Sequence, residues 1–176
     1  MTSAELLAEA FNRIQQEVHS TLEGLGPREL AERVDGERTH PQANTIAWLV
    51  WHLTRVQDDH VADVAGRKQV WHEGGWVDKF GLPFDREATG YGQNSVDVGA
   101  VKPQSADLLV GYYDEVHART LEYVEQLSDR DLERVVDDSY DPPVTLGTRL
   151  ISVISDDLQH IGQAAYVRGL LTREAE

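Results

Sequence analysis

The sequence predicts an all-α protein that folds as a four-helix bundle with long crossover connections. Four long segments carry apolar residues at steps of three and four, which places those residues on one face of a helix. The two halves of the chain also resemble each other at a constant spacing: Leu25, Arg28, Leu30, Val34 and Asp35 match Leu127, Arg130, Leu132, Val136 and Asp137. Each half is therefore expected to hold a long helix, a short helix, a loop and a second long helix.

The first half has clear signals for the ends of its helices. The first long helix starts behind Thr2, which forms a capping-box pattern with Glu5, and ends near Gly24. Its predicted core face consists of Leu7, Phe11, Ile14, Val18 and Leu22. A short helix is expected over residues 27–34, because proline is favoured in the first turn. The second long helix is expected over residues 45–65, and the glycine that follows ends it.

The second half follows a long, irregular connection. Residues 66–104 contain seven glycines and two prolines, and a connection of this length is usually a lid or a binding loop. Its aromatic residues are expected to close the end of the bundle, with one or two of them touching a ligand: Trp71, Trp76, Phe80, Phe84 and Tyr91. Ser105 is a suitable N-cap for the third long helix, and Ser128 begins a short one. The chain breaks at residues 141–143, after which Thr145 can cap the fourth long helix.

Composition limits the classes of function. The net charge of −15 repels phosphate groups, so we expect neither a nucleic acid nor an anionic membrane as a partner. The chain has no cysteine, which excludes disulfides and a cysteine nucleophile, so any thiol must come from outside. The longest apolar run, residues 46–51, is too short to span a membrane, and the N-terminus lacks the pattern of a signal peptide. We expect a single cytoplasmic domain over residues 1–176.

The strongest functional signal lies in the fourth long helix. Asp156 and His160 are four residues apart, so they lie one turn apart on one face, at the edge of the apolar stripe. His52 holds the same kind of border position on the second long helix. If these helices face each other, two imidazoles and one carboxylate form a three-ligand set that leaves room for water or substrate, as in catalytic zinc sites. Two alternatives stay open: the histidines are structural residues, or Asp157, which lies inside the stripe, replaces Asp156 as a ligand.

Three motifs are similar to those of the DinB/YfiT-like superfamily of metalloenzymes: WLVWHLTRVQDDH, GGWVDKFGLP and the closing DLQHIGQAAYVRGLL. The resemblance covers nearly the whole chain and implies a four-helix bundle, often dimeric, with a divalent metal held by three residues. His52 matches the histidine on the second helix, and Asp156 and His160 match the pair on the last helix. Most members have histidine first in that pair, and the aspartate here resembles the carboxylate variant of mycothiol-dependent maleylpyruvate isomerases.

The resemblance also implies a chemistry. Several members resemble transferases that use mycothiol, bacillithiol or glutathione, and a divalent cation, expected to be zinc or nickel, stabilises the thiolate of such a thiol. The leading hypothesis is a metal-dependent thiol transferase of detoxification, a homodimer that joins a low-molecular-weight thiol to an electrophile. The alternatives are a non-catalytic, dimeric metal-binding protein of stress response or scaffolding, and a metal-dependent hydrolase.

Four further residues are candidates for the pocket. His60 lies near the middle of the apolar face of the second long helix, either as a core histidine or as an orienting residue or proton shuttle. Arg55 and Arg168 lie close to the expected mouth, where each either binds a carboxylate of the thiol or substrate or forms an ion pair. Trp76 is the loop aromatic that we expect to contact the substrate.

Overall fold

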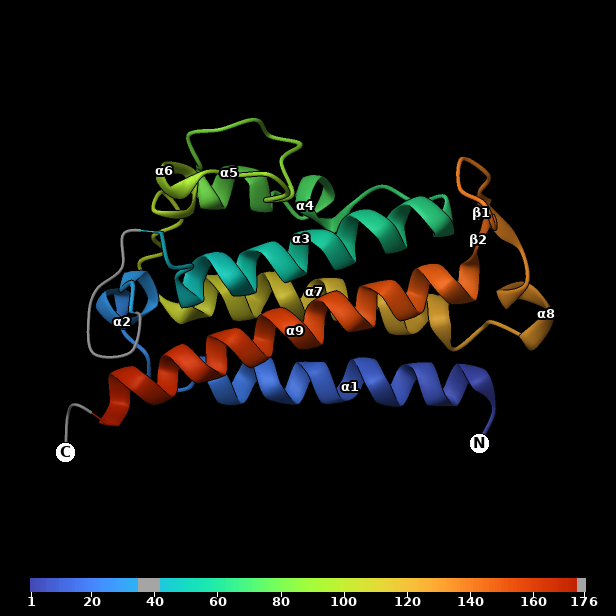
Figure 1. Ribbon diagram of the computed structural model, residues 1–176, viewed down its shortest axis with the longest axis horizontal. Coiled ribbons are helices and arrows are strands. Elements are labelled where there is room, and N and C mark those ends of the chain that lie inside the picture. The colour runs from blue at the N-terminus through green and yellow to red at the C-terminus, as the bar shows by residue number, and fades with distance from the viewer. Residues whose placement is uncertain (35–41, 174–176) are drawn as a thin grey trace.

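The computed structural model describes residues 1–34 and 42–173 (Figure 1). Within this part of the chain, four long helices lie side by side and form the body of the molecule: α1 (Ser3–Leu22), α3 (Ile46–Ala65), α7 (Ala106–Val124) and α9 (Leu146–Arg173). The prediction of an all-α four-helix bundle is confirmed. None of the described helices combines the length and the apolar character that a membrane span requires.

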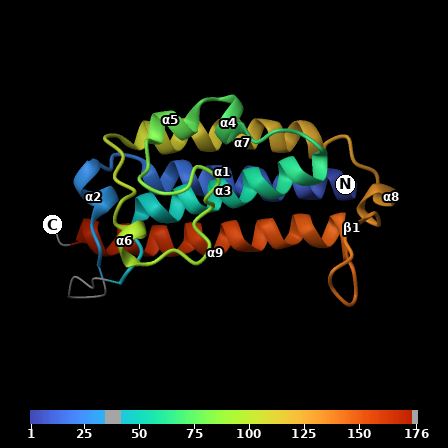
Figure 2. The same ribbon diagram turned by 90° about the horizontal axis from the view of Figure 1, so that it is seen from above.

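The order of the helices around the bundle interlocks the two halves of the chain. Helices α1 and α3 each pack against both α7 and α9, whereas the two long helices of one half lie diagonally across the bundle. Helices α3 and α7 run in one direction, and α1 and α9 run in the other (Figure 1 and Figure 2). Each long helix therefore buries its core face against the other half of the chain. This is the crossover connectivity that the sequence predicts.

Local signals set the ends of the helices in the first half. Glu5 N donates to Thr2 Oγ1 at 3.1 Å, and Thr2 N donates to Glu5 Oε2 at 2.7 Å, which completes the predicted capping box. Thr45 caps α3 by accepting a hydrogen bond from Trp48 N at 3.1 Å. Gly66 ends α3 with a φ of 62°, a left-handed conformation that glycine adopts without strain. The predicted extent of both helices follows from these contacts.

Shorter elements occupy the connections. Helices α2 (Pro27–Ala31) and α8 (Asp129–Leu132) stand at corresponding positions in the two halves, as the repeat predicts, although Asp35 of that repeat lies outside the described residues. The connection from α3 to α7, which the sequence predicts as irregular, contains α4 (Val70–Glu73), α5 (Trp76–Phe80) and α6 (Ser95–Val98). An antiparallel pair of strands, β1 (Val135–Asp137) and β2 (Val144–Thr145), precedes α9. The sequence does not predict these strands, because they are too short to show an alternating pattern.

The inward face of α9 differs in one respect from the predicted stripe. Leu150, Ile154 and Ile161 are buried as predicted, but Leu158 is 47% exposed. Each step of four residues advances about 40° around an α-helix with about 3.6 residues per turn, so a row of such steps leaves the core face. Asp157 takes the central position instead and is fully buried.

Residues 66–104 form a layer over α3 and α7 (Figure 2). A buried carboxylate on α3, that of Asp58, holds the start of this layer. It accepts hydrogen bonds from Val70 N at 2.8 Å, from Trp71 N at 2.7 Å and from the Tyr112 hydroxyl at 2.8 Å. Because these donors come from the layer and from α7, the single side chain of Asp58 ties both of them to α3.

The aromatic residues of the layer cover this α3–α7 face and do not close an end of the bundle. Trp71, Trp76 and Phe80 surround Tyr112, with ring centroids 5.2, 5.6 and 5.9 Å from its ring. Rings at such distances in tilted arrangements pack favourably. Tyr91 is the exception, because its side chain is 94% exposed. The layer is thus a packed wall that carries one exposed aromatic residue.

Candidate metal centre

His52 lies on α3 beside the neighbouring helix α9, and two contacts set its orientation. Its ring stacks on that of Trp48, one turn earlier, with centroids 4.6 Å apart and an interplanar angle of 18°. Nδ1 of His52 lies 2.6 Å from the carbonyl oxygen of Thr89. A carbonyl oxygen can only accept, so Nδ1 carries the proton and Nε2 has the free lone pair. Backbone bonds of this kind orient the histidines that bind metals in many proteins.

The layer approaches His52 closely at Gly90. The backbone of Gly90 has a φ of +101°, which side-chain-bearing residues rarely adopt, and a Cβ atom at this position would collide with the ring of His52. Glycine meets both conditions. The turn at Gly90 therefore allows the carbonyl group of Thr89 to reach the histidine.

Asp156 and His160 complete the group from α9. They lie one turn apart, with His160 Nε2 at 3.6 Å from Asp156 Oδ1. The antiparallel packing of α3 on α9 brings the rings of His52 and His160 together, with centroids 4.8 Å apart. One potential ligand atom from each of the three residues lies within 4.8 Å of the other two. The structure thus brings together all three residues that the sequence singles out as metal ligands.

The geometry and chemistry of this group fit a divalent cation. Metal–ligand bonds of about 2.0–2.2 Å place two ligand atoms at most about 4.4 Å apart across one ion, so small side-chain rotations bring the group to a chelating span. Oδ2 of Asp156 is buried and has no hydrogen-bond partner among the described residues. Buried carboxylate oxygens normally have a partner, and a metal ion supplies one. His52, Asp156 and His160 would hold the ion and leave a coordination position for another molecule.

The protonation states of the group are also suitable. Burial lowers the pKa of His52. Burial acts to raise the pKa of Asp156, but His160 and the other nearby histidines bring it below its ordinary value. The Asp156 carboxylate, 3.6 Å away, raises the pKa of His160. At neutral pH Asp156 is therefore ionised and His52 neutral, as ligands must be, and a metal ion bound at His160 would displace any proton from its ligand nitrogen.

A cleft of about 470 Å³ opens beside His52 and Asp156. Its wall also includes His60, as well as Tyr91 from the layer and Tyr140 from the loop between β1 and β2. This volume lies in the usual range for small-molecule sites, about 300–1,000 Å³. Two of the three candidate ligands, His52 and Asp156, thus border a space that a small substrate can enter.

A polar stripe on α9 lines the same side, and the sequence interpretation does not single out its first two members. Arg149, Ser152, Asp156 and His160 recur at steps of three and four, so they share one face of the helix. Ser152 lines the cleft, and Arg149 contacts its wall at His60. The sequence does contain this pattern. It can be recognised by following the spacing of polar residues, rather than apolar ones, along the helix.

The structure does not bring Arg55, Trp76 and Arg168 to this cleft, contrary to the expectation that they contact the substrate. Arg55 is fully buried beneath the layer and donates to the carbonyl oxygen of Ala88 at 3.1 Å. Trp76 donates to Glu115 Oε2 at 2.7 Å on the α7 side. Arg168 donates to two carbonyl oxygens at the C-terminal end of α1, at 2.8 and 2.6 Å. Their donors are used in structural bonds, whereas the cleft lies between α3 and α9.

Asp157, the alternative carboxylate ligand, is not part of the group. Its side chain is fully buried, and neither of its oxygens has a hydrogen-bond partner among the described residues. Complete burial, and then the adjacent charge of Asp156, raise the pKa of Asp157 well above its ordinary value. The core therefore holds a carboxyl group that favours its neutral form.

This carboxyl group predicts a pH-dependent stability. The unfolded chain loses its proton near a pKa of about 3.9, whereas the folded protein keeps it to higher pH. The free energy of unfolding therefore falls as the pH rises from about 4 towards the raised folded pKa. Asp157→Asn removes this contribution. The free energy of unfolding of the variant, relative to that of the wild type, should therefore rise by up to about 1.4 kcal/mol for each pH unit in that window. Urea unfolding of both proteins between about pH 4.5 and 8 measures the difference, and parallel pH profiles would contradict the prediction.

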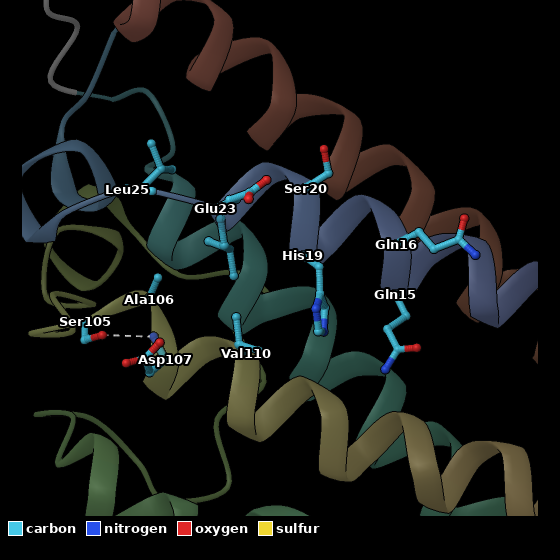
Figure 3. A pocket seen from close by; sticks show the side chains of 12 residues that line it. Gln15, Gln16, His19, Ser20, Glu23, Leu25, Ser105, Ala106, Asp107 and Val110 are labelled. Atoms are coloured by element: carbon cyan, nitrogen blue, oxygen red, sulfur yellow. Dashed lines mark hydrogen bonds between the residues drawn. The ribbon is translucent and has the colours of Figure 1, made fainter.

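A larger hollow, of about 770 Å³, lies between α1 and α7, and the His52–Asp156–His160 group does not line it. Figure 3 shows Gln15 and His19 pointing from α1 towards α7, where both contact Asp114 Oδ1, at 2.8 and 2.7 Å. Volume favours this hollow, but converging ligands are better evidence of chemistry than size. The smaller cleft is therefore the candidate site.

Comparison with known proteins agrees with this fold. A model of the DinB superfamily matches residues 10–164. The crystal structure of a conserved protein from Enterococcus faecalis is similar over 97% of this chain and 97% of that chain, with 27% sequence identity and a TM-score of 0.86. No curated protein matches the sequence. The family match covers most of the chain, and the chain belongs to the DinB superfamily.

Proposed function

We propose that this protein is a divalent-metal-dependent transferase that activates a low-molecular-weight thiol for attack on an electrophile. One observation supports this most directly: two imidazoles and one carboxylate converge within 4.8 Å at the edge of a cleft. Three protein ligands leave a coordination position for an incoming group, which is the arrangement of catalytic rather than structural sites. Two imidazoles and a carboxylate suit zinc or nickel.

The residues of the chain divide the work of this reaction. His52, Asp156 and His160 hold the ion, which, when bound, stabilises the thiolate form of an incoming thiol. The contact from Thr89 and the stacking on Trp48 keep the His52 ring in its ligand orientation. The chain has no cysteine, so the nucleophilic sulfur belongs to a small molecule such as mycothiol, bacillithiol or glutathione. We propose that the protein acts in the cytoplasm, where such thiols are kept reduced.

The test is conjugation of a thiol to monochlorobimane, together with elemental analysis of the untagged protein. We expect one divalent ion per site and conjugation that requires both the ion and an added thiol. A thiol that binds should also raise the melting temperature, since a ligand at about 100 times its Kd adds about 2.7 kcal/mol of stability. Conjugation by chelated protein would contradict the proposal. Ester or amide turnover without thiol would favour a hydrolase, and unfolding on chelation without thiol binding would favour a scaffold.

A further inference from the structure

A chain of three polar side chains from three elements fixes the ring of His60 in the cleft wall. Nη1 of Arg149 on α9 lies 2.9 Å from Nδ1 of His60 on α3, and Nη2 of Arg149 lies 3.2 Å from Oδ2 of Asp137 on β1. The side chain of Arg149 is 17% exposed, so most of it is held within the protein. The carboxylate of Asp137 orients the guanidinium group, and the guanidinium group orients the imidazole.

These contacts decide where the proton of His60 lies. A guanidinium group only donates hydrogen bonds and stays charged, so Nδ1 of His60 must accept and cannot carry a proton. In a doubly protonated ring, the Nδ1–H group would face an N–H group of Arg149, and two donors cannot form a hydrogen bond with each other. His60 is therefore neutral, with its one proton on Nε2. Among the described residues, no side chain or backbone group accepts a hydrogen bond from this Nε2–H.

The free donor belongs to the same cleft as the candidate metal ligands. His60 lines this cleft together with His52 and Asp156. Nε2 of His60 has no lone pair in this state, so it cannot take a proton as a general base. A fixed, neutral donor is suited instead to an atom on which negative charge develops during a reaction.

Resting on the proposed thiol transferase function, we infer that Nε2–H of His60 binds the oxygen of a carbonyl-containing electrophile. The thiolate adds to a carbon–carbon double bond conjugated with the carbonyl group: the C–S bond forms, and the π electrons move to the carbonyl oxygen. His60 stabilises this enolate by its hydrogen bond. The proton that the thiol lost returns from solvent to the α-carbon. Asp59, which also lines the cleft and is not one of the candidate metal ligands, favours a neutral enone over an anionic electrophile.

Two electrophiles separate this role from thiol activation itself. Benzylideneacetone gathers charge on its carbonyl oxygen during attack, whereas monochlorobimane loses chloride. We expect His60→Asn, whose amide is too short to reach the Nε2 position, to lower the ratio of kcat/KM for benzylideneacetone to that for monochlorobimane by about 10- to 100-fold. His60→Gln, which can place an N–H near that position, should recover part of the ratio. His72→Asn, a histidine outside the cleft that contacts Glu87, is the matched control and should leave the ratio at the wild-type value.

A second readout does not depend on activity. Long-range ¹H–¹⁵N correlation spectra distinguish the protonated from the unprotonated ring nitrogen, in both the zinc-loaded and the chelated protein. We expect His60 with Nδ1 unprotonated and Nε2 protonated. An Nδ1–H or doubly protonated ring, or an unchanged ratio in His60→Asn, would overturn the inference. If monochlorobimane and thiol do not react on the wild-type protein at all, the proposed function fails and this role falls with it. If only the enone ratio stays unchanged, the inference alone fails.

Discussion

His160→Ala is expected to abolish metal-dependent thiol conjugation. The substitution removes one of three ligands and leaves His52 and Asp156, which are too few to hold a divalent ion tightly at an open site. Loss of an outer-shell partner of a metal ligand costs about 10- to 100-fold in affinity or activity, and loss of a ligand itself should cost at least about 100-fold. Elemental analysis gives the metal content, and conjugation of monochlorobimane gives the activity.

Gln159→Ala is the matched control for this prediction. Gln159 precedes His160 on the exposed side of α9, where its amide contacts the Ser155 backbone at 3.0 Å. This variant should keep the metal and the conjugation rate of the wild type. If His160→Ala keeps a full complement of metal and conjugates thiol at the wild-type rate, the three-residue site is wrong. If both variants lose activity together with their fold, circular dichroism will show it.

Asp58→Ala should have the largest effect on stability. Its carboxylate is buried, accepts hydrogen bonds from Val70 N, Trp71 N and Tyr112, and lies 3.7 Å from the buried guanidinium group of Arg55. Truncation leaves three donors without their acceptor, and it leaves the buried cation of Arg55 without its paired negative charge. Removing one partner of a buried charge pair costs about 3–5 kcal/mol, so we expect the free energy of unfolding to fall by this amount. Urea unfolding at fixed pH measures the change.

The control for Asp58→Ala is Asp78→Ala. Asp78 also pairs with an arginine, Arg86, at 2.9 Å, but its side chain is 72% exposed. Exposed pairs contribute at most about 1 kcal/mol, so this variant should unfold almost like the wild type. Equal losses in the two variants would contradict the view that Asp58 anchors the layer. Because the layer carries Thr89 and Gly90 to His52, Asp58→Ala should also weaken metal binding.

Much of the fold follows from short-range patterns. The capping residues Thr2 and Thr45, the apolar steps within α1 and the glycine that ends α3 act within one or two turns, so the sequence predicts these helix ends well. The stripe on α9 is less accurate at Leu158, because a row of four-residue steps drifts off the core face over several turns. The layer over α3 and α7 is harder still, since residues 66–104 have no period and are placed by contacts such as those of Asp58.

The candidate site shows the same division. The four-residue spacing of Asp156 and His160 places them on one helix face, the border position of His52 on its own helix marks it as their partner, and family resemblance supports the same three residues. Spacing does not say which of Asp156 and Asp157 turns towards His52, because neighbouring helix positions differ by about 100° and the choice depends on how α9 packs on α3. Arg55 and Arg168 do not line the cleft for a similar reason. Both guanidinium groups donate instead to backbone carbonyl oxygens of residues that lie far away in the sequence.

The sequence by itself determined the helices, the apolar faces that make them pack and the residue types able to bind a metal, because propensity, capping and periodicity are properties of neighbouring residues. Tertiary structure alone decided which ring nitrogen is available on His52 and on His60. The carbonyl of Thr89 leaves Nε2 of His52 free as a ligand, and the guanidinium group of Arg149 leaves Nε2 of His60 protonated as a donor. Those partners are 37 and 89 residues away along the chain, and only the packing of the bundle brings them into contact.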